Sequence, residues 1–190
     1  MSANKVKFGL SNVYIAPLTI GADNTYTYDT PIAVPGAVNI SLSAEGETND
    51  FFADNLKYFS STANQGYSGD LEIAMIPDSI RTAILNEIVD SNGAYTEVAS
   101  SLPKPFAFGF QIDGDKKNRR FWYYNCTLTR PANEGATNET SITPQTDKLT
   151  IKAMPRLSDK KVRTFLELSD TNATAYNGFF SNVYEPEVSE

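Results

Sequence analysis

The residue types that most often carry out acid–base or metal chemistry are scarce in this chain of 190 residues. Histidine is absent, which removes the commonest general base and a common metal ligand. The single cysteine, Cys126, lies between Tyr124 and Leu128 in a predicted strand. A buried thiol without a neighbouring base or cation is a poor nucleophile, so we expect Cys126 to be a small core residue. We predict no catalytic residues and no enzymatic activity.

Charged residues cluster at one predicted turn. Asp113 and Asp115 are spaced like the first ligands of a calcium loop, but Lys116 and Lys117 stand where further oxygen ligands would be needed. We therefore expect no metal ion and no cofactor. The basic residues of this turn could contact DNA, pair with an acidic loop of another subunit, or simply be solvated. They are Lys116, Lys117, Arg119 and Arg120.

The overall charge is acidic, with 16 Lys and Arg against 23 Asp and Glu and a net charge of −7. This disfavours tight binding to a nucleic-acid backbone, because such affinity comes largely from Lys and Arg displacing counterions. No segment approaches the roughly 20 apolar residues of a membrane-spanning helix, and residues 1–10 lack the apolar run of a signal peptide. We therefore expect a protein made in a reducing cytoplasm, without membrane association.

Alternation of apolar and polar residues with period two predicts a protein built mainly from strands. The 11 Phe and 10 Tyr residues agree with this, because aromatic side chains favour pleated sheets. Segment 51–59 is expected to be one strand with a loop-like interruption at Asp54 and Asn55. The acidic run 44–50 before it should project into solvent or toward a partner. The predicted strands are residues 6–16, 37–43, 51–59, 67–76 and 149–153, with a hairpin over 104–130.

One helix is predicted over residues 78–90. Pro77 suits its start, Asp78 favours the positive end of the helix dipole, and Gly93 follows as a stop. Apolar residues from Ile80 onward fall at helical spacing, so the helix should pack on a sheet. Residues 66–85 are thus predicted to form a strand-to-helix junction.

The hairpin over residues 104–130 carries aromatic side chains on both faces of its returning strand, which should therefore be covered on both sides. After residue 155 the periodicity weakens, and a short strand or helical turn is expected within residues 156–190. A chain of this length can form a single core. Residues 1–190 are therefore predicted to form one domain.

Several short motifs, in this order along the chain, resemble the major tail protein of long-tailed bacteriophages of Gram-positive hosts. The resemblance covers roughly residues 5–155. Each motif alone is weak, but their order is specific. The motifs are FGLSNVYIA (8–16), PGAV (35–38), FADN (52–55), GYSGDLE (66–72), DGDKK (113–117), YNCT (124–127), Arg130 with Pro131, and PQT (144–146).

The resemblance implies a tail tube subunit with a β-sandwich or barrel-like domain, one flanking α-helix and a long hairpin. Such subunits form six-fold rings that stack into a hollow tube, through which DNA passes without specific binding. The implied location is the virion tail, and the implied partners are further copies of the chain and the tape measure, distal tail and terminator proteins. The family brings no catalytic, metal or cofactor-binding residues.

Charged segments are the predicted contacts of such an assembly. We predict that the acidic run and the basic turn both lie at subunit or ring contacts, and that the hairpin over residues 104–130 joins neighbours by strand addition. An excess of carboxylates on the tube lining would keep DNA mobile. The predicted contact residues are Glu45, Glu47, Asp50, Lys116, Lys117, Arg119 and Arg120.

Two alternatives stay open at this point. The chain could be another protein of the tube fold, such as a tail terminator or a secretion-system tube protein. From a different class, it could be a carbohydrate-binding β-sandwich that uses Tyr26, Tyr28 and Trp122 as stacking platforms.

Overall fold

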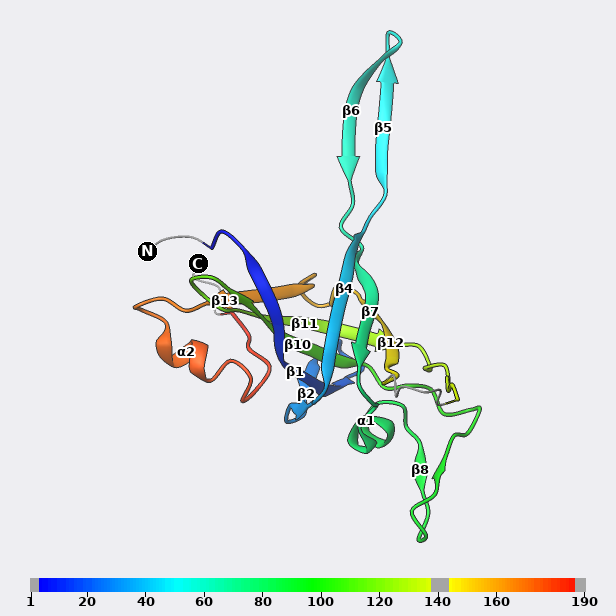
Figure 1. Cartoon of the computed structure of the whole chain (residues 1–190). Helices are drawn as coiled ribbons and strands as arrows, with labels where there is room; N and C mark the ends of the chain where they lie inside the picture. Colours follow the sequence, from blue (N-terminus) through cyan, green and yellow to red (C-terminus); the bar gives the residue numbers. More distant parts are fainter. Residues whose placement is uncertain (1–3, 138–143, 187–190) are drawn as a thin grey trace.

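The computed structural model describes residues 4–137 and 144–186 (Figure 1). Strands make up 47% of the described residues and helices 6%, so the prediction of a mainly-β fold is confirmed. The large antiparallel sheet has the order β2-β1-β10-β11-β12-β7-β4, with β3 and β13 paired to β1 and β11 outside this path. Its strands are β1 (Lys7–Ile20), β2 (Tyr26–Tyr28), β3 (Ile32–Ala33), β4 (Ala37–Glu45), β7 (Gly66–Ile73), β10 (Phe106–Gly114), β11 (Arg119–Leu128), β12 (Asp147–Ala153) and β13 (Arg163–Glu167).

The inner face of this sheet holds the main core. Buried side chains from β1, β7, β10, β11 and β12 pack together there, among them Ile15, Leu71, Phe108 and Leu149. Helix α1 (Asp78–Ala83) adds the fully buried Ile80 at one end of the sheet. Because burying one large apolar side chain stabilises a fold by about 1.5–3 kcal/mol, this cluster is the main source of stability.

The predicted helix over residues 78–90 is too long, because α1 ends at Ala83. Asn86 has a φ of 61°, which a helix cannot contain, and a small hairpin of β8 (Ile88–Val89) and β9 (Tyr95–Thr96) follows. The apolar pattern thus marked burial correctly, since Ile84 and Leu85 are in the core, but overstated the helical length. A second short helix, α2 (Ala173–Asn177), and β13 confirm the strand and helical turn expected after residue 155.

The predicted hairpin over residues 104–130 is confirmed as β10 and β11, at the centre of the sheet. Phe121 and Tyr123 face the main core, whereas Trp122 and Tyr124 belong to a second cluster on the outer face. Gly109 lies opposite Trp122, where a Cβ atom would come within 2.8 Å of the indole ring. Glycine therefore leaves room for the indole, and β11 is covered on both faces as predicted.

The C-terminal segment covers the outer face of β11. Fully buried Phe179 follows α2, and its carbonyl oxygen accepts a hydrogen bond of 2.8 Å from Nε1 of Trp122. The hydroxyl group of Tyr124 donates a 2.9 Å hydrogen bond to the carbonyl oxygen of Tyr184. The polar atoms of the two outer aromatic residues are thereby satisfied, which burial requires.

Arg156 ties this cover to the sheet, with a side chain that is 6% exposed. Its guanidinium forms ion pairs with Asp159 and Glu185 and donates a 3.2 Å hydrogen bond to the hydroxyl of Tyr28. It also lies 4.6 Å from the ring centre of Tyr124, a cation–π distance. We call this group of contacts the Arg156 clasp.

Replacing Arg156 by methionine should reduce the free energy of unfolding by about 2–3 kcal/mol, because the clasp loses its cation while two carboxylates remain. Urea unfolding measures this loss. Lys161→Met is the matched control, since Lys161 forms only longer pairs at 3.3 and 3.8 Å with the same carboxylates. Equal effects of the two substitutions would contradict the role given to Arg156.

Asp159 should make stability depend on pH at the acidic end. Burial alone would raise the pKa of Asp159, but hydrogen bonds from Arg156 and from the backbone of Lys161 outweigh it and lower the pKa to about 2. Such a group stabilises the fold above its unfolded pKa of about 4, and this contribution disappears as the pH falls toward 2.

Because the Asp159 side chain is 33% exposed, we expect this contribution to be about 1–2 kcal/mol. Urea titrations at about pH 6 and about pH 2 should show the loss in the native protein and a smaller loss in Asp159→Asn. The same acid sensitivity in both proteins would rule out this origin.

Candidate assembly surfaces

A hairpin arm stands clear of the body of the protein (Figure 1). It consists of β5 (Thr48–Ala53) and β6 (Leu56–Thr62), and it extends beyond the sheet from the ends of β4 and β7. All residues of the two strands are exposed except Ala53, which is half-buried. An isolated two-stranded hairpin is marginally stable in water, so a partner surface would stabilise this one. We call it the β5–β6 arm.

The arm corrects the prediction of one interrupted strand over residues 51–59. Asp54 and Asn55 are a two-residue turn, with φ angles of 52° and 60°. Positive φ at both positions is typical of a type I′ hairpin, and Asn and Asp tolerate it better than most residues. The loop-like interruption is therefore the tip of a hairpin.

One face of the arm is held together by polar side chains. The hydroxyl groups of Thr48 and Thr62 lie 3.2 Å apart, and Ser60 donates a 2.7 Å hydrogen bond to Asp50. Lys57 pairs with the same carboxylate at 2.6 Å. These cross-strand contacts set the register of the hairpin and leave this face suited to water.

The opposite face of the arm is apolar. Phe51 pairs directly with Phe59, and Ala53 with Leu56. Phe51 and Phe59 are each 61% exposed and Leu56 is 71% exposed, so the described part of the chain leaves this face largely uncovered. Exposed aromatic residues in a contiguous row mark an interaction surface. The register shift beside Phe51 places Phe52, which is 62% exposed, opposite Lys57, so the polar face also carries one exposed aromatic side chain.

Of the three predicted acidic contact residues, Glu45 and Glu47 lie where the arm joins the sheet and Asp50 lies within β5. Glu45 ends β4 and pairs with Lys152 at 3.3 Å, and hydrogen bonds from Ser68 and Lys152 lower its pKa. Asp50 is held inside the arm, where Lys57 and Ser60 lower its pKa. Glu47 is exposed and forms no ion pair within the described residues. The acidic run is thus the base of the arm and not a free loop.

The basic turn between β10 and β11 is clasped by the N-terminal segment. Oδ1 of Asn4 accepts hydrogen bonds from the backbone of Lys116 (3.1 Å) and Lys117 (2.8 Å), and its Nδ2 donates to the Lys117 carbonyl. Asp115 accepts a 2.8 Å bond from the backbone of Lys5. In the described part of the chain, neither Lys116 nor Lys117 has a carboxylate within 4.0 Å.

Arg119 and Arg120, in contrast, are used within the subunit. Arg119 forms an ion pair with Glu167 of β13. Arg120 stacks 4.0 Å above the ring of Tyr176 and donates to its carbonyl oxygen and, at 2.9 Å, to Gln111. These two arginines hold β13 and α2 against β11, so their main role is structural. Of the four predicted basic contact residues, Lys116 and Lys117 are therefore the two whose side chains have no ion-pair partner or structural role within the described residues.

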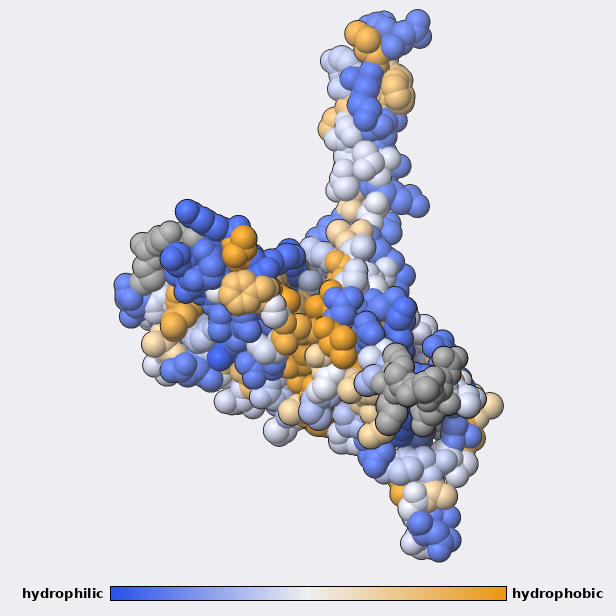
Figure 2. All heavy atoms as spheres, in the orientation of Figure 1, coloured by the Kyte–Doolittle hydropathy of each residue, from blue (hydrophilic) through white to orange (hydrophobic). Residues whose placement is uncertain are grey.

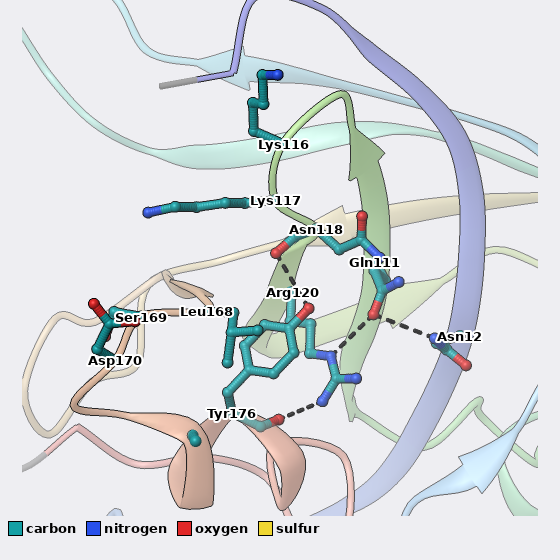
Figure 3. Close-up of a pocket in the computed structure, with 11 residues that line it drawn as sticks. Asn12, Gln111, Lys116, Lys117, Asn118, Arg120, Leu168, Ser169, Asp170 and Tyr176 are labelled. Carbon is teal, nitrogen blue, oxygen red and sulfur yellow. Dashed lines mark hydrogen bonds between the residues drawn. The ribbon is translucent and has the colours of Figure 1, made fainter. Parts of the chain in front are cut away.

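A pocket of about 770 Å³ lies beside this turn (Figure 3). Arg120, Gln111 and Asn12 form one side and Tyr176 another, and the Lys116 and Lys117 side chains extend past its upper side in this view. The hydroxyl of Tyr176 donates a 3.2 Å bond to the carbonyl of Asn118. With Asp170 as its acidic residue, the pocket is lined by more positive than negative groups and would suit an acidic side chain or segment.

Cys126 confirms the sequence prediction, since it is fully buried and burial raises the pKa of its thiol. Trp122 is also fully buried, which excludes it as a platform for stacking sugars. Among the described residues no group of three or more His, Cys, Asp or Glu could hold a metal ion. None of the helices in these residues has the length and apolar character to cross a membrane.

The free strand edges are not those of the hairpin over residues 104–130. β10 is paired to β1 and β11, and β11 is paired on its other side to β12 and β13. The predicted strand addition to this hairpin is therefore wrong, because its edges are occupied. In the described ranges β4 pairs only with β7, and residues 7–12 of β1 pair only with β10.

These two free edges lie beside each other across an apolar opening, which we call the β1–β4 gap. A pocket of about 300 Å³ lies at the end of the gap where β4 begins, between residues 10–14 and 33–37, and Ile40 and Leu42 lie beyond it along β4. Figure 2 shows apolar surface between the body and the strands below the arm. Leu10, Ile40 and Leu42 pack on the main core there and are only half-buried.

Reversing the charge of Lys116 and Lys117 to glutamate should leave the free energy of unfolding within about 0.5 kcal/mol, because neither side chain has an ion pair among the described residues. Arg120→Glu should instead cost about 2–4 kcal/mol, since it places an unpaired charge against Tyr176. Urea unfolding separates the two. If the lysines contact another subunit, their reversal should also weaken self-association and change its salt dependence; no change in either would exclude that role.

Comparison with known proteins identifies no relative of this chain: no family model matches it, and no curated protein sequence matches it. The resemblance to phage tail proteins therefore rests on the order of the short motifs. The surfaces described above are the independent basis for a functional proposal.

Proposed function

We propose that this chain is a structural virion protein, the major tail tube subunit of a long-tailed bacteriophage. Its copies would form stacked hexameric rings around the channel for DNA. The observation that carries the proposal is the β5–β6 arm, whose exposed Phe51, Phe59 and Leu56 form an apolar face that residues 4–137 and 144–186 leave uncovered. A subunit that stays single would gain nothing from such an arm, which is an aggregation hazard in water.

Self-assembly also gives a use to the other open features. Within the described residues the β1–β4 gap leaves two strand edges without a paired strand, and neighbouring chains satisfy such edges readily. Lys116 and Lys117 offer positive charge that a carboxylate of a neighbour can neutralise. An acidic protein with a net charge of −7 would in addition bind DNA weakly, as a conduit requires.

A tail terminator or secretion-system tube protein is the alternative within the same fold. A terminator is expected to stop at one ring, whereas a major tube subunit polymerises. The carbohydrate-binding alternative loses support from the burial of Trp122.

Concentrated purified protein should form rings and tubes visible by negative-stain electron microscopy, with a diameter on the order of 100 Å for six such domains around a channel. A variant in which residues 48–62 are replaced by a short Gly-Ser turn should stay monomeric. Its body should keep an unchanged unfolding midpoint, because neither core cluster contains a residue of the arm. Rings that never stack would favour a terminator, and a native protein that stays monomeric at every concentration would contradict the proposal.

A further inference from the structure

We infer that the acceptor for the β5–β6 arm is the β1–β4 gap of a second copy of this chain. The inference rests on the proposed self-assembly and adds the pair of surfaces that meet. Phe51, Phe59 and Leu56 form the donor surface on the arm. Leu10, Ile40 and Leu42 form the acceptor surface in the gap.

The two surfaces match in chemistry. The apolar face of the arm extends to the tip. The opposite face carries the polar contacts of Asp50, Lys57 and Ser60. The gap has an apolar floor, where half-buried side chains belong to the main core, and a polar rim that includes Ser41 and Ser43 of β4. An arm lying in the gap would bury its aromatic row and keep its polar face toward water. This is the arrangement of an apolar interface centre with a polar rim.

The two surfaces also match in direction and length. β4 forms one side of the gap and leads directly into β5, and the arm runs on from the end of β4 in nearly the same direction (Figure 1). A second copy shifted along this direction therefore has its gap in line with the arm of the first. The six residues of β5 span about 20 Å, enough to follow most of β4.

The free edge of β4 adds backbone hydrogen bonds to this contact. In the part of the chain that the structure describes, β4 is paired to β7 along one side only, so alternate N–H and C=O groups on its other side have no strand partner there. On β1, Gly9 and Asn12 have φ angles of 75° and 51°, and both positions adjoin register shifts. Such irregularities blunt an edge. The arm should therefore pair with β4 and contact β1 through side chains.

Donor and acceptor are different surfaces, so each copy can give one arm and receive another. Contacts of this kind are heterologous, and they propagate from copy to copy instead of stopping at a dimer. A pair of arms bound to each other would be the alternative, and it would stop at two copies. This difference makes the inference testable with mixed variants.

Cross-linking between single-cysteine variants tests the contact, because the native Cys126 is fully buried. The variants Phe51→Cys (arm) and Leu42→Cys (gap) are purified separately, mixed before assembly and allowed to assemble together. The assembled mixture is then treated with a short bis-maleimide. We expect cross-linked dimers that contain one copy of each variant, identified by mass. Each variant alone, and the native protein, should give few. Phe52→Cys, on the polar face of the arm, is the matched control and should cross-link to Leu42→Cys at least about tenfold less.

A second acceptor position protects the test against a folding defect, since Leu42 is half-buried. Ile40→Cys should give the same cross-link to the arm, and urea unfolding shows whether each variant keeps its native midpoint. The double variant Phe51→Ser/Phe59→Ser should raise the concentration needed for assembly at least about tenfold, the effect of losing one central aromatic contact.

The outcomes separate this inference from the proposed function. Tubes without a cross-link from arm to gap, or efficient cross-linking of Phe51→Cys to itself, would overturn the acceptor while leaving the tube assignment in place. Cross-links from arm to gap without rings or tubes would support the acceptor and contradict the tube assignment. Failure of both cross-linking and assembly would overturn both.

Discussion

Burial of β11 on both of its faces is the constraint on which the rest of the structure depends. Phe121 and Tyr123 complete the main core, while Trp122 and Tyr124 need a second cover, which the C-terminal segment provides. That cover packs Phe179, Phe180 and Val183 on the outer cluster, and hydrogen bonds from the buried aromatic residues and the Arg156 clasp also hold it in place. The centre of the sheet is thereby closed to partners. Any surface for assembly must lie at the strand edges, in the turns or in the arm.

The arm has the opposite balance of burial and exposure. In the core, aromatic side chains are covered and their polar neighbours face water, whereas the arm presents Phe51 and Phe59 to solvent on a hairpin held by polar cross-strand contacts. An exposed apolar face of this kind is an aggregation hazard in water, which is why the proposed assembly places it against another copy. Pairing between β5 and β6 sets the register of the hairpin. In the proposed assembly, the position of the whole arm would be set by the copy against which it packs. The fold of the subunit and its assembly are in this sense separate problems.

The sequence predicted the fold class, the central hairpin, the burial of Cys126 and the apolar residues near α1, because these follow from local periodicity. It failed where a single residue or a distant contact decides the outcome. A register shift between β10 and β11 places Cys126 in the main core, although simple alternation from Trp122 puts it on the other face. Arg119 and Arg120 looked free because Glu167 and Tyr176, their partners, lie far along the chain. The arm was missed because apolar residues in a strand usually signal burial, yet Asp54 and Asn55 between two apolar runs were a hairpin signal.

A tube requires two kinds of contact, one that closes each ring and one that joins successive rings, and a single heterologous contact supplies only one of them. The arm runs along the strand direction of β4, so a contact between the arm and the β1–β4 gap relates copies displaced along that direction. The turn that carries Lys116 and Lys117 lies at the other side of the body, on the end of β10 and β11, with its own pocket. Its charge and its distance from the arm suit it to the second kind of contact. The proposed assembly would therefore divide these roles, with apolar burial joining copies along one direction and salt-sensitive charge pairing joining them along another.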